Sequence, residues 1–398
     1  MAFFLLALGA VGHMVLWVAI INRVHGLGIK RRWVKLITVG CVAALVLAPV
    51  AVVAAIVTLV GPQTFATRLA ADGAWGYVAF CAAVCVGSAI QRWYWWQHPE
   101  RNSALLSNHT THIRLPDSSD SFTSPGIPTW LSRIPGNQVL KIRTQEKELA
   151  IPRLNAAHDG LRIVHLTDLH MSGRITQAYY EHVVEEVNSV DADVVAITGD
   201  IVEGDRFLDW LAPTLGRLRA RHGVYYVRGN HDRRASEGPL KAAMAATGII
   251  HVGSTWRQVL VNDAPVIFAG NELPWHKPAA DLSDSPERDS AGLPLRILLA
   301  HSPDQFRWAQ ANDIDLMLAG HLHGGQIRLP LLGAITSPSR HGVRYVAGVF
   351  TAGNTVMHVS RGAGALTPLR FGCPPEVSVL MLRGKRSTYH TGFIAPGE

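Results

Sequence analysis

The segment Leu161–His170 reads LRIVHLTDLH: a short, mostly apolar run that ends on two side chains able to bind a metal, Asp168 and His170. Short apolar runs that end on a polar cluster are typical of buried strands. Helix-like stretches such as Thr176–Val190 and Phe207–Arg221 lie between several of them. This alternation predicts an α/β fold, a β-sandwich flanked by helices. The other runs are Val194–Thr198, Val224–Val227, Val266–Ala269, Ile297–Ala300, Leu316–Ala319, Val356–Val359 and Val377–Leu382.

Polar side chains of three types, His, Asp and Asn, follow five of these predicted strands. Ligands gather outside the carboxyl ends of strands in α/β folds, and these three side chains bind hard or borderline divalent cations. The spacing of Asp168 and His170 puts both on one face of an extended segment. Together the clusters predict a site for two metal ions, made from Asp168, His170, Asp200, Asn230, His231, Asp232, His301, His321 and His323.

Glycines stand beside these clusters, among them Gly199, Gly229 and Gly320. Glycine permits tight turns and close backbone approach, which a crowded site needs. Glu203, three residues after Asp200, could reach a metal or a substrate hydroxyl, but its position favours a solvated side chain. The long segment 273–292 is either a loop that shapes specificity or a surface insertion.

Composition excludes several classes of protein. The chain has 398 residues, of which 48% are hydrophobic and 17% charged, which argues against disorder. The net charge of +7 comes mainly from residues 1–100, which hold seven basic and two acidic side chains, so no nucleic-acid binding is expected. Four cysteines are too few for a disulfide scaffold or a zinc–thiolate cluster.

Three hydrophobic segments near the N-terminus predict membrane helices. Ala2–Ile21 and Leu36–Val60 carry no charge, and the weaker Gly73–Ile90 is followed by an aromatic cluster suited to a headgroup boundary. The loop between the first two segments is rich in Lys and Arg, which predicts a cytoplasmic loop. If all three segments cross, the rest of the chain is cytoplasmic; if the third does not, it faces outward. We expect a multi-pass protein of the bacterial inner membrane.

Four regions are predicted along the chain. Residues 1–97 form the transmembrane region with about three helices, and residues 98–139, rich in Ser, Thr, Pro and Asn, form a flexible linker. Residues 140–385 form the α/β domain. Residues 386–398 form a C-terminal tail.

The order of the polar clusters resembles that of the calcineurin-like metallophosphoesterase superfamily, and within it the bacterial membrane-associated branch of phosphohydrolases. The resemblance covers roughly residues 140–385, and Ala300 stands where most members have glycine. It implies that Asp168, His170 and His323 hold one metal and that Asp200 bridges to a second. The second metal would be held by Asn230, His301 and His321.

The resemblance also implies roles for the remaining residues. His231 would face the scissile phosphate and protonate or stabilise the leaving oxygen, and Asp232 would orient His231. The two divalent ions, manganese, iron or zinc, would hold a bridging hydroxide for in-line attack on phosphorus.

We therefore expect a membrane-anchored phosphodiesterase or pyrophosphohydrolase, with a lipid-linked phosphate as one candidate substrate. A phosphomonoesterase or nucleotide phosphatase would use the same site and remains an alternative. A non-catalytic membrane scaffold on this fold is a third alternative. No oligomeric state is predicted.

Overall fold

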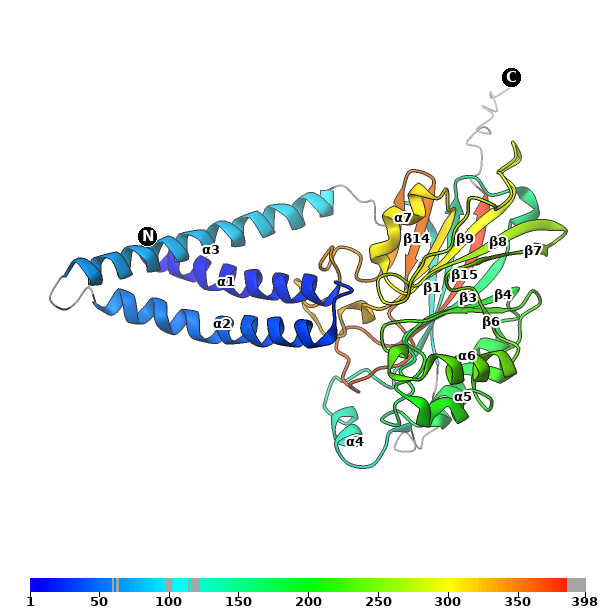
Figure 1. Ribbon diagram of the computed structural model, residues 1–398, viewed down its shortest axis with the longest axis horizontal. Coiled ribbons are helices and arrows are strands. Elements are labelled where there is room, and N and C mark those ends of the chain that lie inside the picture. The colour runs from blue at the N-terminus through cyan, green and yellow to red at the C-terminus, as the bar shows by residue number, and fades with distance from the viewer. Residues whose placement is uncertain (59–60, 62–63, 98–101, 114, 116–121, 385–398) are drawn as a thin grey trace, which may run out of the picture.

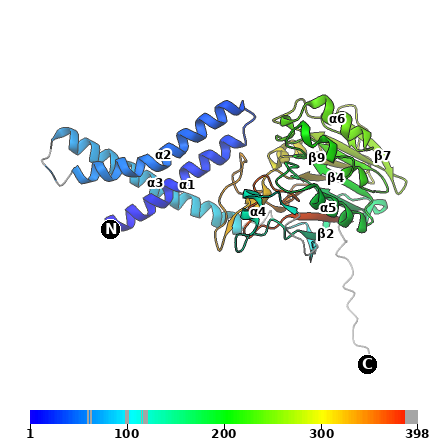
Figure 2. The same cartoon turned by 90° about the horizontal axis from the view of Figure 1, so that it is seen from below.

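The apolar N-terminal segments form three long helices in the computed structural model, which describes residues 1–58, 61, 64–97, 102–113, 115 and 122–384. They are α1 (Ala2–His25), α2 (Arg31–Val57) and α3 (Phe65–Gln97). Their apolar cores have mean hydropathies of 2.3, 2.7 and 1.6, so each is long and apolar enough to cross a membrane. Figures 1 and 2 show them projecting from one end of the folded domain, with the connection between α1 and α2 on the side of the domain.

Helix α1 packs against both other helices through small and polar side chains. A Cβ added at Gly12 would lie only 1.7 Å from the carbonyl oxygen of Cys81 in α3, so glycine lets the two backbones approach closely. The His13 ring contacts the Tyr77 hydroxyl of α3 at 2.6 Å and the Leu45 carbonyl of α2 at 3.0 Å. The three helices therefore form one bundle.

The first sheet of the domain has seven strands in the order β1-β2-β15-β3-β4-β5-β6. Strands β3 to β6 run parallel, and helices α5 (Gln177–Ser189) and α6 (Glu237–Ala246) lie in their connections and pack on the outer face. The strands are β1 (Leu105–His112), β2 (Arg143–Ile151), β3 (Arg162–Leu166), β4 (Val194–Thr198), β5 (Val224–Val227), β6 (Ile250–His251) and β15 (Glu376–Gly384).

The second sheet has six strands in the order β13-β14-β10-β9-β8-β7, and helix α7 (Phe306–Ala311) packs on its outer face. A short hairpin of β11 (Arg328–Leu329) and β12 (Gly333–Ala334) stands apart from both sheets. The six strands are β7 (Trp256–Val261), β8 (Ala264–Asn271), β9 (Leu295–Ala300), β10 (Leu316–Ala319), β13 (Gly348–Ala352) and β14 (Thr355–Val359).

A buried apolar layer joins the two sheets face to face. Ile163 and Tyr225 from the first sheet meet Phe268 and Leu299 from the second, and the rings of Tyr225 and Phe268 stack with centroids 4.3 Å apart. The predicted α/β sandwich with flanking helices, preceded by apolar helices, is confirmed.

The structure differs from the sequence-based expectation in two segments. Within the predicted flexible linker 98–139, Leu105–His112 forms β1 and Ile127–Ser132 forms helix α4. Strand β1 pairs with β2 through its backbone and leaves most of its side chains exposed. Its sequence therefore lacks the alternation of apolar and polar residues that predicts a strand.

The predicted helix at Phe207–Arg221 was wrong. Short 3₁₀ turns at Asp205–Trp210 and Leu215–Arg217 replace it, because Pro213 and Gly216 interrupt a continuous helix. The predicted tail 386–398 lies outside the described residues.

A buried ion pair between β2 and β15, two neighbouring strands of the first sheet, yields a stability prediction. Lys147 Nζ lies 2.6 Å from Glu376 Oε1, and both side chains are almost fully buried. Glu376→Gln should lower the free energy of unfolding by about 3 kcal/mol, because it leaves a buried ammonium without its counter-charge. The combined Lys147→Met and Glu376→Leu variant should recover most of the loss.

Chemical unfolding of the purified chain measures both changes. The control is Glu146→Gln, which changes an exposed carboxylate on β2, the strand of Lys147. It should change the free energy of unfolding little. A double variant as unstable as Glu376→Gln would contradict this account of the pair.

Candidate metal centre

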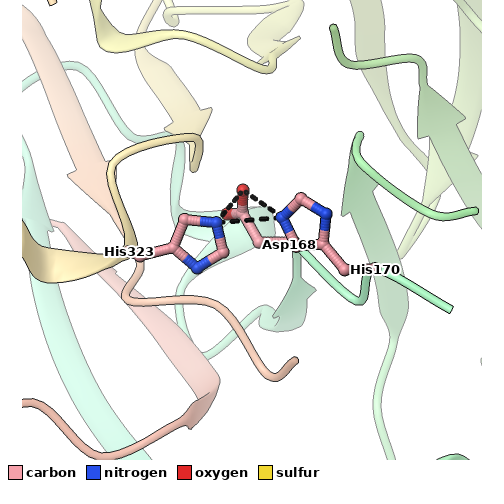
Figure 3. A group of neighbouring side chains, drawn as sticks. All are labelled: Asp168, His170 and His323. Carbon is pink, nitrogen blue, oxygen red and sulfur yellow. Dashed lines mark hydrogen bonds and ion pairs between the residues drawn. The ribbon is translucent and has the colours of Figure 1, made fainter. Parts of the chain in front are cut away.

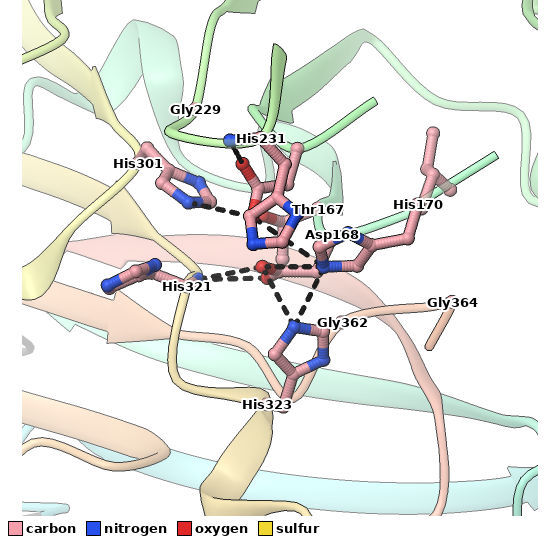
Figure 4. Close-up of polar contacts among 12 residues, drawn as sticks. Thr167, Asp168, His170, Gly229, His231, His301, His321, His323, Gly362 and Gly364 are labelled. Atoms are coloured by element: carbon pink, nitrogen blue, oxygen red, sulfur yellow. Dashed lines mark hydrogen bonds and ion pairs between the residues drawn. The ribbon is translucent and has the colours of Figure 1, made fainter. Parts of the chain in front are cut away.

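The carboxyl ends of five strands meet at one edge of the sandwich, and each delivers a side chain predicted from the sequence. Strands β3, β4 and β5 of the first sheet and β9 and β10 of the second contribute them, and the side chains converge in Figure 4. The carboxylates of Asp168 and Asp200 are at most 1% exposed. The members of this cluster are Asp168, His170, Asp200, Asn230, His231, His301, His321 and His323.

Five of these residues have backbone φ angles between 48° and 73°, namely Asp168, His170, Asp200, His321 and His323. Residues other than glycine rarely adopt this left-handed conformation, which costs about 1–2 kcal/mol each. Such strain persists where the surrounding structure enforces it, and it clusters at functional sites.

One group of candidate ligands consists of Asp168, His170 and His323 (Figure 3). His323 Nε2 lies 2.9 Å from His170 Nε2 and 3.5 Å from Asp168 Oδ1. The two nitrogens and the carboxylate oxygen therefore face one point, as the ligands of a single cation must.

A second group consists of Asp200, His301 and His321, with Asn230 beside it. His301 Nε2 lies 3.3 Å from Asp200 Oδ2 and 3.1 Å from Asn230 Oδ1. Asp200 Oδ2 also lies 3.6 Å from His170 Nε2, so this carboxylate stands between the two groups.

In three of the histidine rings, a hydrogen bond engages one nitrogen and leaves the other to face the cluster. His301 Nδ1 donates to the Thr198 carbonyl at 2.7 Å, and His321 Nε2 donates to the Pro338 carbonyl at 3.0 Å. His170 Nδ1 donates to Glu203 Oε1 at 2.6 Å. The opposite nitrogen of each ring faces the cluster, as the ligating nitrogen of a metal-bound histidine does.

The charges of the cluster also fit cations. Within the described part of the chain, no Lys or Arg forms an ion pair with Asp168 or Asp200. Although burial disfavours its charged form, the carboxylates of Asp200 and Asp168 raise the pKa of His301 to about 9. Two buried carboxylates thus retain a proton on a neighbouring ring, and a bound cation would replace that proton.

Two other rings stay neutral, as metal ligands must. Burial, together with the positive charge of His301, lowers the pKa of His321 to about 3. Burial, with His170 and Arg370 nearby, lowers the pKa of His323 well below its ordinary value. The donor set and its charges therefore fit divalent cations.

Glu203 lies at the site, although the sequence reasoning favoured a solvated position. Its side chain is only 4% exposed, against our expectation of a solvated residue. One oxygen accepts from His170 Nδ1, and the same oxygen lies 2.7 Å from His231 Nδ1, while the other pairs with Arg234. The backbone N–H of Glu203 donates a hydrogen bond of 3.0 Å to the Met171 carbonyl, so the chain turns back toward the loop after β3. The distance of Glu203 from Asp200 along the sequence does not predict this turn.

Asp232 lies elsewhere than expected. Its carboxylate accepts hydrogen bonds from the backbone N–H groups of Asp200, Ile201, Val202 and Gly229, at 2.7–3.1 Å. It therefore ties the loop after β4 to the loop after β5, while Glu203 takes the contact with the His231 ring.

Gly229 and Gly320 allow the strand ends to close on one another. A Cβ at Gly229 would lie 2.2 Å from Asp200 Oδ1, and one at Gly320 would lie 2.4 Å from Asp168 Oδ2. Any side chain at either position would displace a carboxylate of the site.

The family is decided by comparison with known proteins. Residues 161–325, which hold every residue of the cluster, match the family described as calcineurin-like phosphoesterase. The chain is 34% identical over 240 residues to phosphodiesterase YaeI of Escherichia coli K12, covering 59% of this chain and 86% of that protein. The chain belongs to the calcineurin-like metallophosphoesterases. It is therefore a metal-dependent phosphoric ester hydrolase.

Two further relatives extend the comparison. The chain is 31% identical over 249 residues to the uncharacterized metallophosphoesterase YkuE of Bacillus subtilis, covering 61% of this chain and 86% of that protein. It is 25% identical over 324 residues to the UDP-2,3-diacylglucosamine pyrophosphatase LpxG of Chlamydia trachomatis, covering 65% of this chain and 98% of that protein.

Glu203 yields a prediction for this metalloenzyme. Glu203→Ala should lower metal affinity and activity together by about 10- to 100-fold, because it frees the His170 and His231 rings that Glu203 orients. Metal titration and phosphodiester hydrolysis measure both quantities. Glu185→Ala, on the surface of α5 with a 57% exposed side chain, is the matched control. Unchanged metal affinity in Glu203→Ala would show that His170 needs no such support.

Proposed function

We propose that the chain is a membrane-anchored phosphodiesterase or pyrophosphohydrolase that works with two divalent cations. The observation that carries this proposal is the position of Asp200, whose Oδ2 lies within 3.6 Å of His170 Nε2 in one group and 3.3 Å of His301 Nε2 in the other. We assign Asp168, His170 and His323 to one cation and Asn230, His301 and His321 to the second. Asp200 is shared.

When bound, two such cations supply an activated water and neutralise charge on the phosphoryl oxygens. The chain itself supplies the rest. His231 is 18% exposed at the edge of the cluster, and its Nδ1 is engaged by Glu203. Its Nε2 is then available to donate a proton to the leaving oxygen, and the Glu203 carboxylate stabilises the protonated ring.

We also propose a lipid-linked phosphate as the substrate. The chain carries three helices able to cross a membrane, which would hold the site next to lipid. The name of the relative LpxG describes a pyrophosphatase that acts on a nucleotide-linked diacylglucosamine. Both observations support a phosphodiester or pyrophosphate that joins a polar group to an acylated one.

The membrane topology follows from charge. The connection between α1 and α2, with its flanking Lys and Arg residues, lies at the end of the bundle that meets the domain. Basic loops stay in the cytoplasm, so we place the domain on the cytoplasmic face of a bacterial inner membrane.

Variants of Asp200 and His231 should separate metal binding from turnover. Asp200→Asn should lose bound metal and activity together, because both cations lose a shared ligand. His231→Ala should keep its metal and lose about 10²- to 10⁴-fold in kcat, because only proton transfer is removed. Metal content by mass spectrometry and hydrolysis of bis(4-nitrophenyl) phosphate are the measurements.

Two matched controls accompany these variants. Asp191→Asn changes a carboxylate that is 70% exposed, and His182→Ala changes a partly buried ring of α5 that is 26% exposed. Both should resemble the wild type. A fully active His231→Ala enzyme would refute the role given to this ring.

The length of the alkyl group on a phosphodiester tests whether the substrate is lipid-linked. The full chain in detergent micelles should hydrolyse 4-nitrophenyl hexadecyl phosphate with a kcat/KM about tenfold above that for 4-nitrophenyl ethyl phosphate, since the long chain adds apolar contact. Equal values for the two diesters would argue against a lipid substrate and leave the phosphodiesterase activity standing.

A further inference from the structure

A cavity of about 610 Å³ lies between the membrane helices and the candidate metal centre. One wall comes from the end of α1, the connection to α2 and the first turns of α2, and includes Ile29 and Val39. The opposite wall includes Asn230 and His231 of the candidate centre. The cavity therefore connects the reacting site with the membrane bundle.

The helix connection packs directly on the domain. A Cβ at Gly28 would lie 2.5 Å from the Pro274 side chain, and one at Gly26 would lie 2.7 Å from the backbone nitrogen of Arg340. Glycine at both positions permits this close contact, which fixes the membrane-side wall against the domain.

Trp275, next to Pro274, forms the boundary between the cavity and the candidate ligands. Its ring also lines the cavity, with its centroid 4.8 Å from that of His321 and 5.5 Å from that of His301. The long segment 273–292 therefore contributes a side chain to the site, which favours a loop that shapes specificity over a surface insertion.

The two walls differ in chemistry. The membrane-side wall exposes apolar side chains, with Leu27 37%, Ile29 38% and Val39 66% exposed. Lys35 and Arg233 add positive charge, and within the described residues neither forms an ion pair with a carboxylate. An apolar wall beside free cations suits a ligand with an apolar chain and an anionic head.

The surface beside the ends of α1 and α3 also exposes apolar side chains. The hairpin of β11 and β12 projects Leu331, fully exposed, and Leu332, 56% exposed. Arg92 of α3 donates a hydrogen bond to the Leu332 carbonyl, and Asn22 of α1 donates to the Ile335 carbonyl at 3.1 Å. Exposed leucines held against membrane helices are suited to lie among lipid headgroups and chains.

We propose that this cavity is the substrate subsite for the acylated part of a membrane phosphoester or pyrophosphate, so that the α1–α2 connection forms part of the active site. This inference rests on the proposed function. The anionic head lies between Arg233 and the candidate metal centre, and the apolar chain lies along Ile29 and Val39 toward the bilayer. The helices thus select the substrate as well as anchoring the enzyme.

The test compares two valines of α2 in the full chain. Val39→Ser changes the cavity wall, and the control Val57→Ser changes a valine at the far end of the same helix that is 59% exposed, against 66% for Val39. The readout is the ratio of kcat/KM for 4-nitrophenyl hexadecyl phosphate to that for 4-nitrophenyl ethyl phosphate. Val39→Ser should lower this ratio about fivefold, and Val57→Ser should leave it unchanged.

A second pair of variants tests the position proposed for the anionic head of the substrate. Arg233→Gln should raise KM about fivefold for both anionic diesters, whereas the exposed Arg219→Gln should not. Wild-type ratios in both Val39→Ser and Ile29→Ser would overturn the subsite while short-chain hydrolysis upholds the proposed function. Failure of the wild-type chain to hydrolyse either diester in the presence of metal would overturn the proposed function itself.

Discussion

Two carboxylates buried among imidazoles are the constraint on which the rest of the structure depends. Asp168 and Asp200 are at most 1% exposed, and histidine rings surround them instead of Lys or Arg in the part of the chain that the structure describes. Burying two anions without strong cationic partners is costly, and divalent cations relieve that cost. The strained backbone of five of the surrounding residues is a further cost that the fold accepts to aim these groups inward.

The sandwich provides the frame that enforces this arrangement. Parallel strands bring their carboxyl ends to one edge, and the two sheets contribute to it from opposite sides. Asp232 then locks two of the loops by accepting four backbone hydrogen bonds, and Glu203 orients two rings. The connection between α1 and α2 lines a cavity that also reaches Asn230 and His231, so the helix bundle and the site lie next to one another.

The strands and the candidate ligands were predictable because each depends on local sequence. Apolar runs such as Val194–Thr198 match a strand residue for residue, and the polar residues after them converge as parallel strands require. Glu203 and β1 were not predictable, since one depends on a turn that folds back across Met171 and the other on backbone pairing with little burial of side chains. The cavity at the membrane depends on contacts between residues 26–28 and distant loops, which no local pattern encodes.

Anomalous diffraction from crystals of the full chain grown with manganese tests the central claim most directly. The account predicts two peaks in the cluster, one next to Asp168, His170 and His323 and the other next to Asn230, His301 and His321, with the Asp200 carboxylate between them. A cluster without a peak, or with a single peak that leaves Asp200 uncoordinated, would contradict it.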